Sequence, residues 1–421
     1  MKKVRIIKSP SGYTLKKPLT LEIPEPRNQI ETNVQRYVIK TFVGQYPHLA
    51  QVTFDNKSMT ELAKHLLIHR TGSHATLYNY ACSVQRFCRW LNTSPDKLIS
   101  ECKDRDKTPI LKGIAKTKQN LADFADDLQA KNHLAPATIH NMMSHIQCWF
   151  RINGVDLKLL YRITKWALHE ARAPSLEELQ KILDAADLRE KVIITMLATG
   201  GFRRGTLIKL QYRHVKLDLE NHVFPIHVHV EAEITKAKHH DYDTFLCQEV
   251  AEYLEAYLKA RQKGWKGRPP EQITYHSPLI SNARRKPKPV TPSYINDLIE
   301  ELYAKAGLIT KNSGIRRYKL RTTSLRKFFR TQLAFLGVDR DYIEYMMGHK
   351  ISTYFDIKMR GIEFLRGIYL SSGISIRPQP EEKKIAALKQ IILSWQLNPE
   401  KILTPEALGK LQKKHNQSKH Y

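Results

Sequence analysis

The stretch from Leu320 to Tyr354 constrains this chain most, because it sets a few reactive side chains on two amphipathic helices. Apolar residues at helical spacing predict a first helix that Gly337 ends. They predict a second helix that Asp339 caps and Gly348 ends. Four side chains with reactive or charged groups stand at the edges of this framework: Arg326, Lys327, His349 and Tyr354.

Such a set suits a phosphodiester. A guanidinium matches two phosphate oxygens, a lysine or histidine can donate a proton, and a tyrosine can attack phosphorus. The same residues would equally form surface salt bridges and an interface aromatic. This stretch alone therefore leaves both interpretations open.

A second stretch, from Leu197 to Val215, favours the chemical interpretation. It reads as a helix end, a glycine break and a new helix. Arg203 stands at the start of the new helix, where free N–H groups and the helix dipole favour an anion.

Together the two stretches resemble the catalytic domain of the tyrosine recombinases, the phage-integrase family, and most closely its archaeal members. The family's first arginine box has the form T-G-x-R-x-x-E-L-x-x-L, and its second combines H-x-x-R with a later G-H. The matching residues are Thr199, Gly201, Arg203, Leu207 and Leu210 in the first box, and Arg326, Gly337, Gly348 and His349 in the second. The separation of Arg326 and His349 is also the one usual in the family. Two positions depart from the pattern: Thr206 replaces the family's Glu, and Thr323 replaces its first His.

The resemblance implies a mainly α fold with a small antiparallel β-sheet, in which a helical core-binding domain precedes a catalytic domain of the DNA breaking-rejoining fold. It implies a transesterification that needs no cofactor or metal. A tyrosine attacks the scissile phosphate and leaves a 3′-phosphotyrosine and a free 5′-hydroxyl. Arg203 and Arg326 would neutralise the phosphorane, and Lys327 or His349 would act on the nucleophile's proton or on a phosphate oxygen.

The family also carries a lysine on a β-turn, which protonates the leaving 5′-oxygen. Lys236 is the first choice for this role and Lys238 the second. Several histidines surround them, namely His227, His229, His239 and His240. Without a matching Cys or carboxylate pattern, they are more typical of a sheet surface or a DNA contact than of a zinc site.

The nucleophile is ambiguous, because Lys358 and Met359 stand about where the family has its tyrosine. Tyr354 is favoured. Tyr369 is the alternative, although its surroundings match the helix that follows the nucleophile in the family.

The overall charge points to a polyanionic partner. The chain has 421 residues and a formal net charge of +28, spread along its length. This balance favours double-stranded DNA. An anionic membrane would be the other candidate, but no apolar run reaches the length of a membrane span. No signal peptide is evident, and the five cysteines form no Cys-x-x-Cys pair, so we expect reduced thiols in a cytoplasmic protein.

Four segments follow from the patterns. We expect an N-terminal arm over 1–54, a helical DNA-binding domain over 55–155, a catalytic domain over 172–376 and a basic tail over 377–421. Ser175 and Glu178 form a capping-box pattern at the start of the catalytic domain. The resemblance further implies a homotetramer on paired sites. The candidate DNA contacts are Arg86, Arg89, His140, Arg151, Arg284, Arg285, Lys286 and Lys319.

Three other functions stay open on the sequence alone. A type IB topoisomerase uses the same chemistry on single DNA sites. A catalytically impaired DNA-binding relative would fit the two departures at Thr206 and Thr323 and the displaced tyrosine. A basic RNA-binding or scaffold protein would leave the spacing of the two boxes unexplained.

Overall fold

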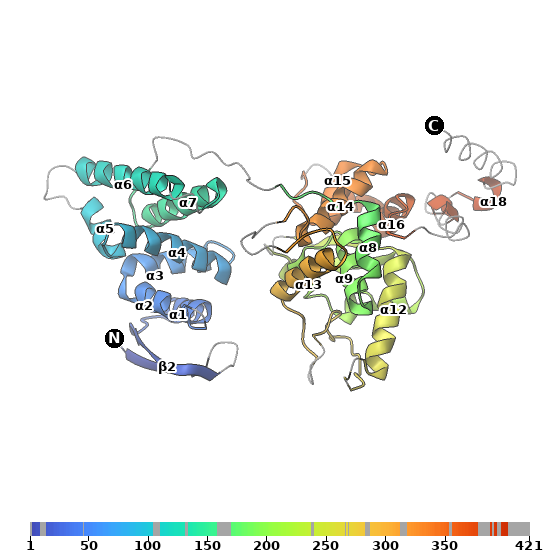
Figure 1. Cartoon of the computed structure of the whole chain (residues 1–421), viewed down its shortest axis with the longest axis horizontal. Helices are drawn as coiled ribbons and strands as arrows, with labels where there is room; N and C mark the ends of the chain where they lie inside the picture. Colours follow the sequence, from blue (N-terminus) through green and yellow to red (C-terminus); the bar gives the residue numbers. More distant parts are fainter. Residues whose placement is uncertain are drawn as a thin grey trace. The chain divides into compact units, whose positions relative to one another are not determined.

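The computed structural model describes residues 2–8, 14–44, 46–103, 110–130, 134–157, 170–236, 240–265, 267, 269–282, 287–311, 318–352, 356–377, 388–389, 391–393 and 397–402. The chain forms two compact units, Met1–Leu168 and His169–Tyr421, and each is described by itself (Figure 1). The fold is mainly helical with small antiparallel sheets, as the sequence predicts. Within the described ranges, no helix is long and apolar enough to cross a membrane.

The N-terminal unit is a β-hairpin followed by a helical bundle. Its elements are β1 (Lys2–Lys8), β2 (Thr14–Ile23), α1 (Gln29–Phe42), α2 (Pro47–Asp55), α3 (Lys57–Ile68), α4 (His74–Trp90), α5 (Pro95–Lys103), α6 (Ile110–Ala130) and α7 (Pro136–Ile152). β1 pairs antiparallel with β2. Ser83 and the ring of Tyr80 on α4 contact His145 on α7, so α4 and α7 pack together.

One core runs through this unit and crosses the boundary expected at residue 54. Phe42 of α1 and Leu49 of α2 are buried in the same cluster as Phe87 of α4 and Trp149 of α7. The segment expected to be an arm therefore supplies two helices to the bundle. The physical reason is that both helices carry an apolar face, and this core buries it.

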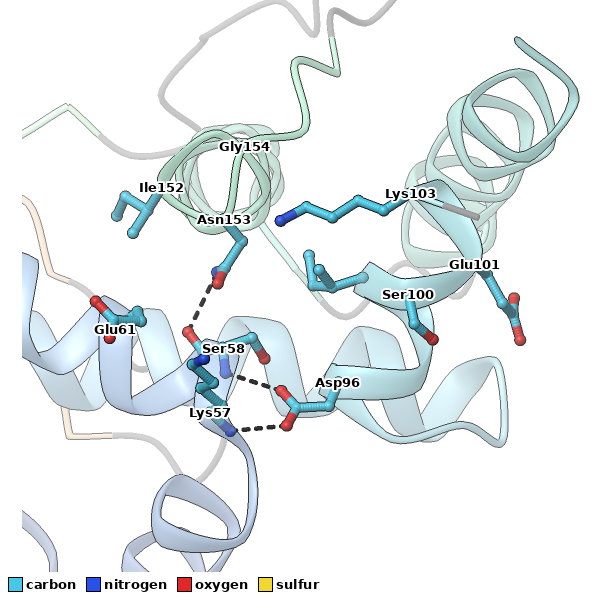
Figure 2. Close-up of a pocket in the computed structure, with 11 residues that line it drawn as sticks. Lys57, Ser58, Glu61, Asp96, Ser100, Glu101, Lys103, Ile152, Asn153 and Gly154 are labelled. Carbon is cyan, nitrogen blue, oxygen red and sulfur yellow. Dashed lines mark hydrogen bonds between the residues drawn. The ribbon is translucent and has the colours of Figure 1, made fainter. Parts of the chain in front are cut away.

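Asp96 of α5 binds the start of α3. Its carboxylate accepts hydrogen bonds from the backbone N–H groups of Lys57 (2.7 Å) and Ser58 (2.8 Å) at the start of α3. Asn153, just after α7, donates to the Ser58 carbonyl oxygen. Figure 2 shows these bonds beside a pocket of about 860 Å³. A carboxylate at a helix start satisfies donors that have no partner within the helix.

The second unit carries the two arginine boxes. Its elements are α8 (Leu176–Asp184), α9 (Leu188–Thr199), α10 (Arg204–Leu207), the 3₁₀ turn η1 (Tyr212–His214), α11 (Lys216–Glu220), β3 (Ile226–Val230), the 3₁₀ turn η2 (Ala232–Ile234), β4 (Tyr242–Leu246), α12 (Gln248–Lys263), α13 (Pro292–Lys305), α14 (Thr322–Phe335), α15 (Arg340–Met346), the 3₁₀ turn η3 (Ile357–Arg360), α16 (Gly361–Ser371) and α18 (Pro399–Ile402). The capping box of Ser175 and Glu178 forms at the start of α8, as predicted.

Helix α9 is the centre of this unit. Its residues from Val192 to Thr199 are buried on every side, and α12, α14 and β4 pack around it. The hairpin of β3 and β4 is antiparallel, with Ile226 opposite Leu246 and Val230 opposite Tyr242. The first arginine box thus begins at the end of a helix that is fixed by core packing on every side.

Candidate active site

A glycine turn directs the first box from α9 towards α14. Gly201 has φ +64°, and a Cβ built there would lie 2.6 Å from the ring of Phe329. Its carbonyl oxygen accepts a hydrogen bond from Arg326 Nη1. Glycine is thus required for both the backbone angle and the close approach of α14.

Arg203 and Arg326 meet at the carboxyl end of α15. Arg203 Nη1 donates to the carbonyl oxygens of Met347 (3.3 Å) and Gly348 (3.1 Å). Arg326 Nη2 donates to the same Met347 oxygen. The last carbonyls of a helix carry its partial negative charge, so they are suited to hold two cations side by side.

The arginine pair is short of negative charge. Burial, together with the nearby positive charge of Arg203, lowers the pKa of Arg326 to about 10. Thr206, at the family's Glu position, is buried and carries no charge. No carboxylate within the described ranges bonds directly to either guanidinium. An anion placed between the two arginines would therefore be strongly stabilised.

A second glycine turn returns His349 to Arg326. Gly348 has φ +63°, and a Cβ there would lie 2.5 Å from the ring of Tyr242. His349 Nε2 lies 3.0 Å from Arg326 Nη2, and His349 Nδ1 contacts a carboxylate oxygen of Glu344. Since a guanidinium can only donate, Nε2 is the acceptor and the imidazole proton is on Nδ1, which donates to Glu344.

Glu344 was not among the residues that the sequence singled out. It also accepts a hydrogen bond from Arg330 Nε at 2.7 Å. Burial alone would raise the pKa of Glu344, but the hydrogen bonds from His349 and Arg330 outweigh it and the pKa is lowered. The carboxylate is therefore ionised where it supports the histidine. Its position five residues before His349, in a predicted helix, was the only signal in the sequence.

Lys236 lines the same cavity as the arginines. This cavity has a volume of about 630 Å³, and Arg203, Arg326, Thr323 and Lys236 are among the residues that line it. The Lys236 side chain is exposed and follows η2, between β3 and β4. A cation on a short loop at this position can approach a phosphate that the arginines hold.

Two anchors hold that loop. Glu231 bonds to His214 Nε2 at 2.9 Å and accepts from Arg213. Asp241 accepts a hydrogen bond from the Ala232 N–H at 2.7 Å. The base of the lysine loop is thus tied on both sides.

Two other sequence candidates lie elsewhere. Lys327 Nζ donates to the carbonyl oxygen of Ala171 and is not among the residues that line the cavity. Tyr369 is 1% exposed, and its hydroxyl donates to the Thr199 carbonyl at 2.8 Å. Burial raises the pKa of Tyr369 well above its ordinary value. Both contacts are typical of structural roles, whereas Tyr354 and Lys238 lie outside the described residues.

The histidines near the lysine serve a buried carboxylate. Asp243 of β4 accepts from His227 Nε2 (2.9 Å) and His229 Nδ1 (2.8 Å), and from the Tyr345 hydroxyl of α15. Among the residues described, no group of three or more His, Cys, Asp or Glu side chains could hold a metal ion. His239 falls outside the described ranges. The cluster therefore joins the hairpin to the helix that carries Glu344.

The candidate DNA contacts divide into two groups. Arg86, Arg89, Arg151 and Lys319 are exposed, and His140 is partly buried. The other three candidates, Arg284, Arg285 and Lys286, lie outside the described residues.

Residues 172–355 match the phage integrase family. Solved structures to which the chain is similar at low identity include three DNA complexes. The XerH site-specific recombinase bound to palindromic difH substrate in a post-cleavage complex is 14% identical, with 88% of this chain and 99% of that chain covered and a TM-score of 0.49. The Tn1549 transposon integrase in complex with transposon right end DNA is 16% identical, with 78% and 98% covered and a TM-score of 0.49.

A lambda integrase dimer bound to a COC′ core site is 15% identical, with 74% of this chain and 79% of that chain covered and a TM-score of 0.47. The comparison with curated proteins found no match. Residues 172–355, which contain both arginine boxes, therefore form a domain of the phage integrase family.

Proposed function

We propose that this protein is a site-specific DNA recombinase that cuts and rejoins DNA through a 3′-phosphotyrosine intermediate. One observation carries the proposal: Arg203 and Arg326 converge on the Met347 carbonyl, with His349 against Arg326. Lys236 lines the cavity that these arginines share. Each of these groups corresponds to a task in phosphoryl transfer.

The arginine pair binds the scissile phosphate and stabilises the phosphorane. Within the described residues, Arg203 uses only Nη1 for the backbone carbonyls, so Nε and Nη2 are left for phosphate oxygens. Fixed guanidinium groups act best where negative charge grows in a site that is partly shielded from water. Removing such a group from a preorganised site costs roughly 100- to 1,000-fold in rate.

Tyr354 is the nucleophile in this proposal. The buried, hydrogen-bonded hydroxyl of Tyr369 supports the choice, because that phenol fills a core position. The positive charges of Arg203 and Arg326 would favour ionisation of an attacking phenol nearby. Lys236 then donates a proton to the departing 5′-oxygen, which keeps the step balanced without a metal.

Double-stranded DNA is the proposed partner, and a homotetramer on paired sites is the proposed assembly. The net charge of +28 supports tight backbone binding through counterion release. The exposed Arg86, Arg89 and Arg151 of the N-terminal unit are the proposed backbone contacts in that unit. Binding should weaken steeply with salt as phosphate contacts are lost.

The test is covalent capture from a library of nicked duplexes with a randomised core. A detergent-stable protein–DNA adduct should form on a defined subset of sequences, and sequencing of the captured DNA should return one site. Tyr354→Phe should abolish the adduct, whereas Tyr369→Phe should retain it. Absence of any adduct from the unaltered protein contradicts the proposal, and relaxation of plasmid without site selection would indicate a topoisomerase instead.

A further inference from the structure

Glu344, His349 and Arg326 form a continuous chain of contacts from a carboxylate to the phosphate site. Glu344 accepts from Nδ1 of the imidazole, and Nε2 of the same ring accepts from the guanidinium of Arg326. The His349 backbone N–H also donates to the Glu344 carbonyl oxygen at 3.0 Å. Glu344 therefore fixes the ring through both backbone and side chain.

This series of contacts is important for the charge balance of the arginines, because they lack the acidic neighbour that the family has at the position of Thr206. Thr206 supplies an uncharged hydroxyl there. Within the part of the chain that the structure describes, Glu344 is the carboxylate that connects to Arg326, and it does so only through His349. The negative charge of Glu344 is thus separated from the arginine pair by the imidazole ring of His349.

We propose that Glu344 is a positioning residue that acts through His349: it fixes the imidazole with Nε2 towards the scissile phosphate and stabilises the ring's positive charge during cleavage. The inference rests on the proposed recombinase function. When phosphate oxygens take the donors of Arg326, Nε2 faces a phosphate oxygen. The ring then takes up one proton from solvent at Nε2, and the N–H bond so formed donates a hydrogen bond to that oxygen; His349 takes no part in the bonds made or broken at phosphorus.

A carboxylate on the far nitrogen is the physical basis for this role. It selects the tautomer and supports the imidazolium, as in other carboxylate–histidine pairs. Charged groups from several of the described segments lie near the ring. Arg326 and Arg330 approach from α14 and Glu344 from α15, while Arg203 binds the adjacent Gly348 carbonyl. Lys350 is exposed and follows the ring in sequence.

The test is single-turnover cleavage of a nicked suicide substrate by Glu344→Gln across about pH 5.5 to 8.5, the range in which a histidine changes charge. Glutamine keeps the shape of the side chain but not its charge. We expect the cleavage rate to fall at least about tenfold at the alkaline end and to approach that of the unaltered protein as the pH is lowered, since acid supplies the proton that the carboxylate favoured. DNA binding should be unchanged.

Glu301→Gln is the matched control. It makes the same change of charge in the exposed ion pair of Glu301 and Lys305 on α13, whose oxygen and nitrogen lie 2.9 Å apart. Its cleavage rate should stay within about threefold of the unaltered protein, as expected for an exposed ion pair.

A second measurement separates positioning from simple structural support. In a His349→Ala background, Glu344→Gln should cause no further loss, because the group through which it acts is gone. A loss of equal size at every pH, or one that persists without the imidazole, overturns the inference, as does an unaltered rate. If the unaltered protein forms no adduct, the proposed function itself fails; if it does and Glu344→Gln matches it, only this inference fails.

Discussion

Arg203 and Arg326 donate hydrogen bonds to the same backbone oxygen, the carbonyl of Met347 at the end of α15. The first arginine follows the central helix α9, and the second lies on α14. Their convergence depends on the turns at Gly201 and Gly348, which bring three segments to one point. The site is therefore as much a product of backbone geometry as of charged side chains.

Gly348→Ala should destabilise the protein more than Gly337→Ala does. Both glycines have positive φ, at +63° and +82°, but only a Cβ at Gly348 would meet another group, the ring of Tyr242. Gly337→Ala should cost about 1 kcal/mol from backbone strain, and Gly348→Ala about 1–3 kcal/mol more from overpacking. Denaturant unfolding of the two variants measures the difference, and equal stabilities would contradict this packing account.

Asp243 should make stability depend on acid. Burial opposes its charge, but hydrogen bonds from His227, Tyr345 and His229 outweigh burial and hold its pKa well below the usual value. A depressed carboxylate pKa contributes stability that is complete above its unfolded value, about 3.9, and declines as the pH falls below that. Asp243→Asn should therefore lower the unfolding free energy at neutral pH, and the gap should narrow below about pH 4.

Unfolding curves from neutral to acid pH for the two proteins check this. A constant gap across that range would mean that the ionised carboxylate contributes nothing. Tyr345→Phe is a useful companion, since it removes one donor to Asp243 and keeps the carboxylate. Tyr345→Phe should also lower the unfolding free energy at neutral pH, by less than Asp243→Asn does, and this loss should also shrink in acid.

Asp96→Ala should destabilise the N-terminal unit by about 1–2 kcal/mol, because two backbone N–H groups at the start of α3 lose their acceptor. Asp123→Ala is the matched control. Its exposed side chain bonds only to Gln119 among the residues described, and its loss should cost under about 0.5 kcal/mol. Thermal unfolding of the two full-length variants measures both losses of stability. Identical unfolding midpoints for Asp96→Ala and Asp123→Ala would contradict the capping role.

The sequence predicted the elements whose signals are local. The capping box of Ser175 and Glu178 depends on neighbouring residues, and it forms. The two arginine boxes fixed the positions of Arg203 and Arg326 because their spacing is specific. The predicted turn at Gly348 has a positive φ, as a helix-ending glycine often does.

Contacts between residues that are far apart along the chain could not be predicted from the sequence. The helices expected as an arm share the core of the bundle, because Phe42 and Leu49 find partners far along the chain. Lys327 is adjacent to Arg326 but projects from another side of α14 and reaches Ala171. The link from Glu344 to Arg326 exists only once the Gly348 turn has folded His349 back.

The most direct test of the central claim is a double-mutant cycle on Arg203 and Arg326, read as the single-turnover rate of adduct formation. Each arginine-to-alanine variant should lose roughly 100- to 1,000-fold, with Lys259→Ala, an exposed cation of α12, as the unaffected control. If both guanidiniums act on one phosphate, the double variant should be less impaired than the product of the single losses. Losses that multiply, or single variants as active as the control, would contradict the account.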